Sequence, residues 1–329
     1  IGVLTSVNCS ATVARRIADA FPDATLPKGV DGVVAFTHQG GCGGSSLSSD
    51  VTLLQRTLAG YAKHPNFHSI LIVGLGCEAN QIPSWLANEG LEAGAHLRTL
   101  TIQEAGGTAR AIEAGVAVVR ELVDEAAKVE RQPVSASHLT VGLQCGGSDG
   151  WSGVTANPAL GAAVDLLVAH GGSAMLSETP EIWGAEHLLL RRAASQDVAD
   201  KLNARLAWWR DYADRHQMEL NNNPSPGNKA GGLTTILEKS LGAVAKGGTS
   251  TLRGVYRYAE RIDRKGFVYM DTPGYDPVAA TGQVAGGANV LCFTTGRGSA
   301  YGCKPVPSIK LATNTPLCQR MEGDMDINC

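Results

Sequence analysis

Reactive side chains recur directly after short apolar stretches of this sequence. Cys77 and Glu78 follow ILIVGLG, Cys145 follows LTVGLQ, and Asp271 follows FVYM. The same arrangement places Asn8-Cys9-Ser10 after VLTSV, His38 and Cys42 after GVVAFT, and Thr294-Thr295-Gly296-Arg297 after VLCF. Because ligands of α/β proteins gather at the carboxyl ends of strands, the pattern predicts one large site. It favours a catalyst over a scaffold.

The cysteine and histidine residues of this pattern predict a metal site. Thiolate and imidazole groups are good ligands for borderline or soft divalent metals, including iron. The expected ligands, which only the fold could bring together, are His38, Cys42, Cys77 and Cys145. Glu78 and Glu178 are secondary candidates. A buried cysteine can also serve in packing alone, and this stays the alternative for each cysteine taken singly.

Acidic and basic residues near other strand ends are candidates for proton transfer and substrate binding. Glu178 and Asp271 each precede Thr-Pro, where a carboxylate can move a proton or cap a helix. Lys229 ends the rigid PSPGNK segment and suits a base or a carboxylate clamp, with a solvated turn as the alternative. An anion nest is expected around Arg297. The residues expected to bind substrate are Asn228, Thr294, Thr295, Gly296, Arg297, Ser148 and Asp149.

Composition narrows the class of protein. The chain has 329 residues, of which 43% are hydrophobic and 5% aromatic, with a net charge of -3. This length suggests roughly two domains, and the charge and few aromatic residues argue against a nucleic-acid partner. No apolar run approaches the roughly 20 residues of a membrane span. The eight cysteines contain no CxxC pair and do not suggest a disulfide scaffold, so we expect a reducing, cytoplasmic location.

Strands and helices alternate along the chain, which predicts two Rossmann-like α/β domains with parallel sheets and the site at the carboxyl ends of strands. The boundary is expected near Arg131-Gln132-Pro133, giving domains 1–134 and 135–329. We expect strands at 2–7, 32–37, 69–75, 97–102, 139–143, 173–177, 266–270, 289–294 and 308–312. Helices are expected at 11–20, 49–63, 81–89, 107–130, 157–170, 181–194, 196–217 and 233–241. Residues 221–229 contain too many turn formers for a helix, and 324–328 is expected to be an exposed tail, with metal ligation by Asp324, Asp326 and Asn328, or support of the ligands, as alternatives.

Long motifs of the chain resemble the altronate/galactarate dehydratase family. They include GLQCGGSDGWSGVTANPALG at 142–161, NPSPGNKAGGLTTILEKSLG at 223–242, MDTPGYDP at 270–277 and TTGRGSAYG at 294–302. The resemblance implies a hydro-lyase that dehydrates a sugar acid to a 2-keto-3-deoxy acid. It also implies a divalent metal, with Fe²⁺ expected, Mn²⁺ the alternative and an iron–sulfur cluster a third option. Family members often carry a small N-terminal domain, fused or as a separate subunit, and we expect both ends of this chain to be cut.

The residues support a β-elimination in which Lys229 and Arg297 grip the substrate carboxylate. The base would be Lys229 or one of the acids Glu178 and Asp271. A sulfolactate sulfo-lyase, which the same family includes, is an alternative activity. A non-catalytic sugar-acid binding subunit and a thiol-based redox enzyme are alternatives of other classes. The sequence leaves the sugar acid open, and it does not distinguish a monomer from a homo-oligomer.

Overall fold

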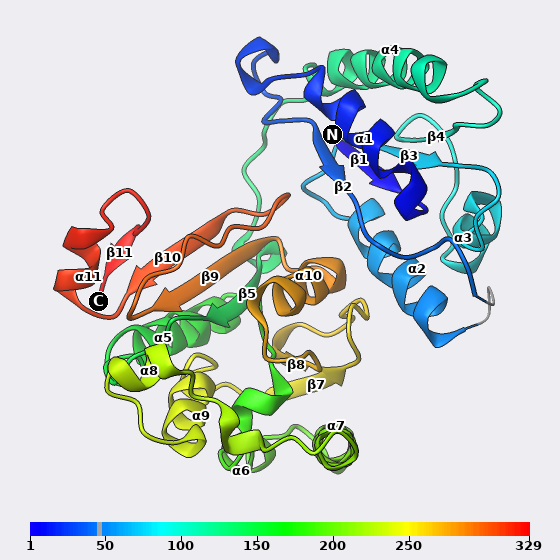
Figure 1. Cartoon of the computed structure of the whole chain (residues 1–329). Helices are drawn as coiled ribbons and strands as arrows, with labels where there is room; N and C mark the ends of the chain where they lie inside the picture. The colour runs from blue at the N-terminus through cyan, green and yellow to red at the C-terminus, as the bar shows by residue number, and fades with distance from the viewer. Residues whose placement is uncertain (45–47) are drawn as a thin grey trace. The chain divides into compact units, whose positions relative to one another are not determined.

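The chain folds into two compact units, Ile1–Pro133 and Val134–Cys329. The computed structural model describes residues 1–44 and 48–329 (Figure 1). Residues 45–47, between the strand expected at 32–37 and the helix expected at 49–63, lie outside the described residues. Within the described part of the chain, no helix is both long enough and apolar enough to cross a membrane.

The first unit contains a parallel sheet in the order β2-β1-β3-β4. All five residues of β3, ILIVG, are buried, as expected for a strand covered on both faces. Gly115 brings two helices close together, because a β-carbon there would clash with Ile17. The strands are β1 Gly2–Thr5, β2 Val34–Phe36, β3 Ile70–Gly74 and β4 Leu97–Thr101. The helices are η1 Asn8–Ser10, α1 Ala11–Asp19, η2 Asp23–Thr25, α2 Ser49–Ala62, α3 Ile82–Asn88 and α4 Thr108–Ala126.

The second unit contains a seven-stranded parallel sheet in the order β11-β10-β9-β5-β6-β8-β7. Figure 1 shows β5, β9 and β10 side by side in this unit. The chain enters the sheet at β5, which has β6 on one side and β9 on the other. The strands are β5 Thr140–Cys145, β6 Ser173–Leu176, β7 Leu252–Tyr256, β8 Gly266–Met270, β9 Val290–Thr295, β10 Ser308–Ala312 and β11 Ile327–Asn328. Two all-parallel sheets with intervening helices confirm the predicted fold class.

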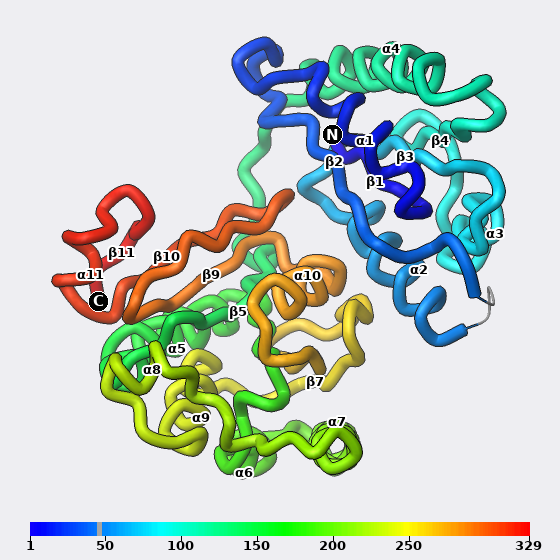
Figure 2. Tube along the Cα trace, viewed as in Figure 1, coloured from blue at the N-terminus to red at the C-terminus, as the bar shows by residue number. Residues whose placement is uncertain are grey.

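Helices of the second unit carry several of the residues described below. In the trace of this unit (Figure 2), α5 and α9 pack against each other. Their close approach depends on Gly161 of α5, because a β-carbon there would clash with the carbonyl oxygen of Ala245 in α9. The helices are η3 Ala136–His138, α5 Ala156–Ala169, η4 Thr179–Ile182, α6 His187–Leu190, α7 Gln196–Arg215, η5 Leu220–Asn222, α8 Pro226–Ala230, α9 Ile236–Ala245, α10 Asp276–Gly286 and α11 Thr315–Arg320.

Three local predictions were wrong. The helix expected over 181–194 is replaced by η4 and α6, because Gly184 between them adopts a φ of 84°. The turn-rich segment contains α8, which Ser225 stabilises through a capping box with Asn228. The expected tail joins the sheet as β11, and the Asp326 carboxylate accepts a hydrogen bond from the Lys310 backbone N–H at 2.8 Å.

Candidate metal and substrate site

The carboxyl ends of β5 and β6 bring three potential metal ligands together in the second unit. Cys145 ends β5, and Glu178 and Glu181 follow β6. The strand order reverses around β5, and such a switch point is where ligands bind in open parallel sheets. One ligand atom from each of the three residues lies within 4.8 Å of the others, and all three side chains are buried. Of the residues that the structure describes, no other set of three meets this condition.

Both carboxylates leave an oxygen unsatisfied inside the protein. Among the described residues, none donates a hydrogen bond to Oε1 of Glu178 or to Oε2 of Glu181. Glu178 also adopts a left-handed backbone conformation, with φ 71° and ψ 67°. Left-handed geometry costs a non-glycine residue on the order of 1 kcal/mol or more and is concentrated at functional sites. The fold therefore sustains both an unpaired carboxylate and a strained backbone at this position.

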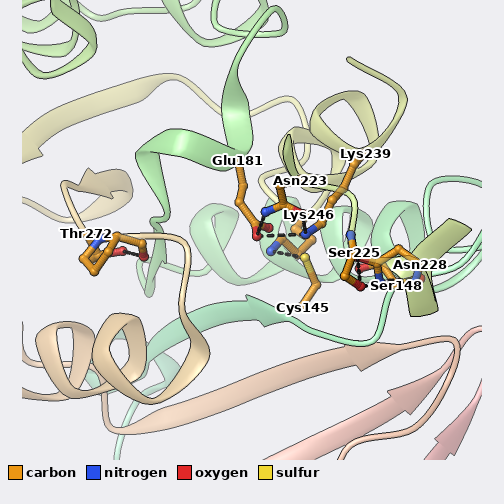
Figure 3. Close-up of polar contacts among 10 residues, drawn as sticks. Cys145, Ser148, Glu181, Asn223, Ser225, Asn228, Lys239, Lys246 and Thr272 are labelled. Atoms are coloured by element: carbon orange, nitrogen blue, oxygen red, sulfur yellow. Dashed lines mark hydrogen bonds and ion pairs between the residues drawn. The ribbon is translucent and has the colours of Figure 1, made fainter. Parts of the chain in front are cut away.

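Two buried lysines face the three acidic groups. Lys239 Nζ donates to Glu181 Oε1 at 2.8 Å, and Asn223 Nδ2 donates to the same oxygen at 2.8 Å. Lys246, which is only 1% exposed, donates from Nζ to Cys145 Sγ at 2.9 Å. Figure 3 shows Lys239 and Asn223 directed at Glu181, and Lys246 directed at Cys145. Each lysine thus fixes one member of the set of three.

Burial and the neighbouring charges shift the pKa values of the groups in this cluster. Burial, and then the nearby charge of Glu181, raise the pKa of Glu178 well above its usual value. Burial likewise raises the pKa of the Cys145 thiol, against the pull of Lys246. Burial alone would lower the pKa of Lys246, but the Cys145 sulfur and the Glu178 carboxylate outweigh it and raise that pKa. A further cation at the unpaired oxygens would stabilise the ionised carboxylates and thiolate.

The donor set of Cys145, Glu178 and Glu181 fits a divalent metal ion. It offers one sulfur and two unpaired carboxylate oxygens, a mixture that suits borderline metals such as iron. Lys239 and Asn223 occupy Glu181 Oε1 and leave Oε2 free. Hydrogen bonds of this kind orient metal ligands in proteins.

Asp271, a candidate base, belongs to a hydrogen-bond network that stabilises the turn carrying Glu178. Its Oδ1 accepts hydrogen bonds from Thr179 Oγ1 at 2.7 Å and Trp209 Nε1 at 2.8 Å. Thr272 Oγ1 accepts a hydrogen bond from the backbone N–H of Glu178 at 2.9 Å. The two residues at the end of β8 thereby hold the strained turn that presents Glu178.

Asp149 is the centre of a second buried network. Its carboxylate accepts hydrogen bonds from Ser152 Oγ at 3.0 Å, Thr313 Oγ1 at 3.0 Å and Asn314 Nδ2 at 3.1 Å. Gly296 lies directly on this carboxylate, so that a β-carbon there would clash with it. The contact between Asp149 and Gly296 therefore holds the loop after β9 against the loop after β5.

Replacing Gly296 with alanine is expected to destabilise the second unit by about 1–3 kcal/mol, because the added carbon overpacks the Asp149 network. Urea unfolding of the purified protein measures this change. Gly302→Ala is the matched control, since a β-carbon there has no atom within 4 Å. Equal midpoints for the two variants would contradict the packing described here.

The other residues expected to bind substrate have structural contacts or lie on the surface. Thr294 Oγ1 donates to Asn157 Oδ1 at 2.5 Å, and Thr295 Oγ1 accepts from the Gly298 N–H at 3.0 Å. Asn228 Nδ2 donates to the Ser148 carbonyl at 2.9 Å, which ties α8 to the loop after β5. Side chains at two further positions, Lys229 and Arg297, are exposed.

The remaining expected ligands belong to the first unit. His38 Nε2 lies 2.9 Å from the Thr5 carbonyl, and its Nδ1 accepts from the Gly40 N–H at 3.2 Å, so both ring nitrogens contact the backbone. Cys42 and Cys77 are exposed. Glu78 is buried, and hydrogen bonds from Ser6 and the backbone N–H groups of Gly76 and Leu75 outweigh burial and lower its pKa. This carboxylate supports its loop.

Sequence reasoning missed Glu181, Lys239 and Lys246. Lys239 lies in the largely apolar helix α9 and Lys246 directly follows it, seven residues further on, which places the two side chains on one face. That spacing was the one feature of the sequence that pointed to a shared role for the two lysines, but two charged residues on one face of a helix usually indicate a solvated surface. Glu181 follows Glu178 by three residues. It was missed because it is the first residue of the helix expected over 181–194, where an acidic residue is common.

Comparisons with known proteins cover both units. Residues 136–329 match the family model described as D-galactarate/Altronate dehydratase, C-terminal. Residues 1–127 match the model described as D-galactarate dehydratase/Altronate hydrolase, second domain.

Curated relatives match over nearly the whole chain. An altronate dehydratase of Bacillus subtilis is 37% identical over 99% of this chain and 65% of its own length. A galactarate dehydratase (L-threo-forming) of Escherichia coli is 39% identical over 100% of this chain and 64% of its own. The (2R)-sulfolactate sulfo-lyase subunit beta of Chromohalobacter salexigens is 31% identical, over 95% and 79%. This chain thus spans less than two thirds of the two dehydratases, and it belongs to the D-galactarate/altronate dehydratase family.

Proposed function

We propose that this chain is the catalytic region of a metal-dependent hydro-lyase. Its substrate is a sugar acid of the altronate or galactarate type, and its product is a 2-keto-3-deoxy acid. The observation that carries the proposal is the buried group of Cys145, Glu178 and Glu181, with two unpaired carboxylate oxygens. It occurs in a chain whose relatives are named altronate and galactarate dehydratases.

Cys145, Glu178 and Glu181 are the proposed ligands of the metal, with Fe²⁺ as the first candidate and Mn²⁺ as the second. When bound, a divalent cation supplies Lewis-acid stabilisation of the negative charge that develops during elimination. This proposal replaces His38, Cys42 and Cys77 as ligands by two carboxylates of the second unit. The engagement of both His38 nitrogens with the backbone supports the replacement.

The two buried lysines hold the ligand side chains in place during the reaction. Lys246 fixes the sulfur of Cys145, and Lys239 fixes the carboxylate of Glu181. Ammonium groups at these positions also favour an anionic substrate over a neutral one. The cluster thereby combines a rigid ligand set with a positive contribution to the local potential.

Arg297 and Lys229 are the proposed contacts to the substrate carboxylate. Helix α8, which carries Lys229, meets the loop of Arg297 at Gly231, where a β-carbon would lie 3.1 Å from Arg297 Cδ. The loop after β9 is anchored to the loop after β5, because the Arg297 backbone N–H donates a hydrogen bond to the Gly147 carbonyl at 2.7 Å. An exposed guanidinium on an anchored loop suits bidentate binding of a carboxylate.

Arg297→Met is expected to raise KM for the sugar acid by about 10–100-fold, because charge-assisted hydrogen bonds contribute about 1.5–3 kcal/mol. The value of kcat should stay within about threefold, since uniform binding is lost. Steady-state kinetics with Arg215→Met as the control measure this, Arg215 being an exposed residue at the end of α7. A fall in kcat with unchanged KM would contradict the assignment.

A substrate panel tests the proposed function. The full-length protein, with any partner subunit, is incubated without oxygen with Fe²⁺ and separate hexonates, hexarates and sulfolactate. Formation of a 2-keto acid from a hexonate or hexarate supports the proposal. Sulfite release from sulfolactate alone would replace it with carbon–sulfur lyase activity, and binding without turnover would indicate a sugar-acid binding subunit. The visible absorption spectrum of the same sample separates an iron–sulfur cluster from a single metal ion.

A further inference from the structure

Asp276 lies beside the metal ligand set, although it is neither among the site residues predicted from the sequence nor among the proposed ligands. It is the first residue of α10, and its side chain is partly exposed. Its Oδ2 lies directly against Gly146, so close that a β-carbon at residue 146 would clash with it. Gly146 is the residue that follows Cys145. The Asp276 carboxylate is therefore held close to the start of the loop that carries the proposed ligand.

The hydrogen bonding of Asp276 differs from that of the other acids in this unit. Asp271 and Asp149 each accept hydrogen bonds from two or more side chains. Within the described residues, only the backbone N–H of Asp276 itself donates to its carboxylate. A carboxylate that is anchored by neighbours supports structure, whereas one that is free and partly exposed can accept a proton from a substrate.

The charged groups that face Asp276 come from several elements. Glu181 and Glu178 face it from the turn after β6, and Tyr301 faces it from the loop after β9. Lys239 faces it from α9 and Lys246 from the residue that follows α9. Burial and the charge of Glu181 raise the pKa of Asp276 to about 6, against the opposing effect of the two lysines. The Asp276 carboxylate therefore lies among the charged groups of the proposed ligand set.

We propose that Asp276 is the general base that removes the proton from C2 of the sugar acid, a role that rests on the proposed function. The C2–H electron pair forms the C2=C3 double bond as the C3–O bond breaks. The hydroxyl leaves with its electron pair and takes up a proton to become water. The resulting enol tautomerises to the 2-keto acid, and Asp276 returns its proton to the leaving hydroxyl or to solvent.

The test compares Asp276→Asn with wild type in the full-length protein loaded with Fe²⁺. We expect kcat to fall by about 10²–10⁴-fold, the usual contribution of a general base, while bound iron and the unfolding midpoint stay unchanged. The acidic limb of the wild-type kcat/KM profile should disappear from the residual activity, because the titrating carboxylate has been removed. Asp276→Glu, which keeps a carboxylate, should recover part of the loss.

Asp197→Asn is the matched control, because Asp197 also lies in the first turn of a helix but is exposed and pairs with Lys201. It should keep wild-type kcat and the acidic limb. Retention of more than about a tenth of kcat by Asp276→Asn, or a loss that follows only the loss of iron or of folding, would overturn the role of Asp276. A wild type that dehydrates no acid of the panel would instead remove the proposed function, and with it this role.

Discussion

Replacing Cys145 with serine is expected to reduce bound iron to less than about a tenth of one equivalent and to lower kcat by about 100-fold or more. The substitution removes the only thiolate of the ligand group and leaves Lys246 beside a hydroxyl that is a poorer ligand for iron. Elemental analysis and 2-keto acid release, measured on the same anaerobic sample, check both effects.

Cys292→Ser is the control for this substitution. Cys292 is a partly buried cysteine on β9 that packs against the hydrophobic core and lies outside the ligand group. It should keep its iron and its turnover. If Cys145→Ser also kept both, the ligand group proposed for the second unit would be wrong.

Glu178→Gln and Glu181→Gln are expected to change the free energy of unfolding in opposite directions, although both should abolish turnover. In the metal-free protein, Glu178→Gln removes a buried carboxylate with an unpaired oxygen and should stabilise the second unit by about 1 kcal/mol. Glu181→Gln removes the charged partner of Lys239, whose side chain is only 9% exposed. Leaving that ammonium group without its partner should cost about 3 kcal/mol.

Urea unfolding of the metal-free variants at pH 8 measures this difference, and Glu130→Gln, an exposed substitution in the first unit, provides the reference. Added Fe²⁺ should stabilise wild type and neither variant, because binding to the folded state alone shifts the unfolding equilibrium. Destabilisation of similar size by both substitutions would show that Glu178 has a structural partner and is not held for a ligand.

Much of the fold could be predicted because strands buried on both faces are nearly continuous apolar runs. ILIVG at β3 and GFVYM at β8 are fully buried and were predicted almost to the residue. The missed elements have different patterns. In β7, LRGVY carries an exposed arginine and a glycine. In α10, Gly282 and Gly286 permit close contact with Tyr258 and Met270, yet in the sequence they resemble a loop.

The site could be predicted only in part, for a related reason. Cys145 ends one apolar strand and Glu178 comes shortly after another, so their positions at the carboxyl edge follow from the strands themselves. Lys239 and Lys246 come from α9 and the residue after it, which contact η4 after β6, and no local pattern distinguishes a buried lysine from an exposed one. Asp276 was passed over in favour of Asp271, which directly follows its strand and is engaged with Thr179 and Trp209.

X-ray absorption spectroscopy of the iron-loaded protein tests the central claim most directly, because it counts the sulfur atoms bound to the metal. The ligand group of Cys145, Glu178 and Glu181 predicts one sulfur at about 2.3 Å, with oxygen or nitrogen atoms completing the shell, and loss of that sulfur in Cys145→Ser. Three sulfur ligands, as Cys42, Cys77 and Cys145 together would provide, or none at all, would contradict the account.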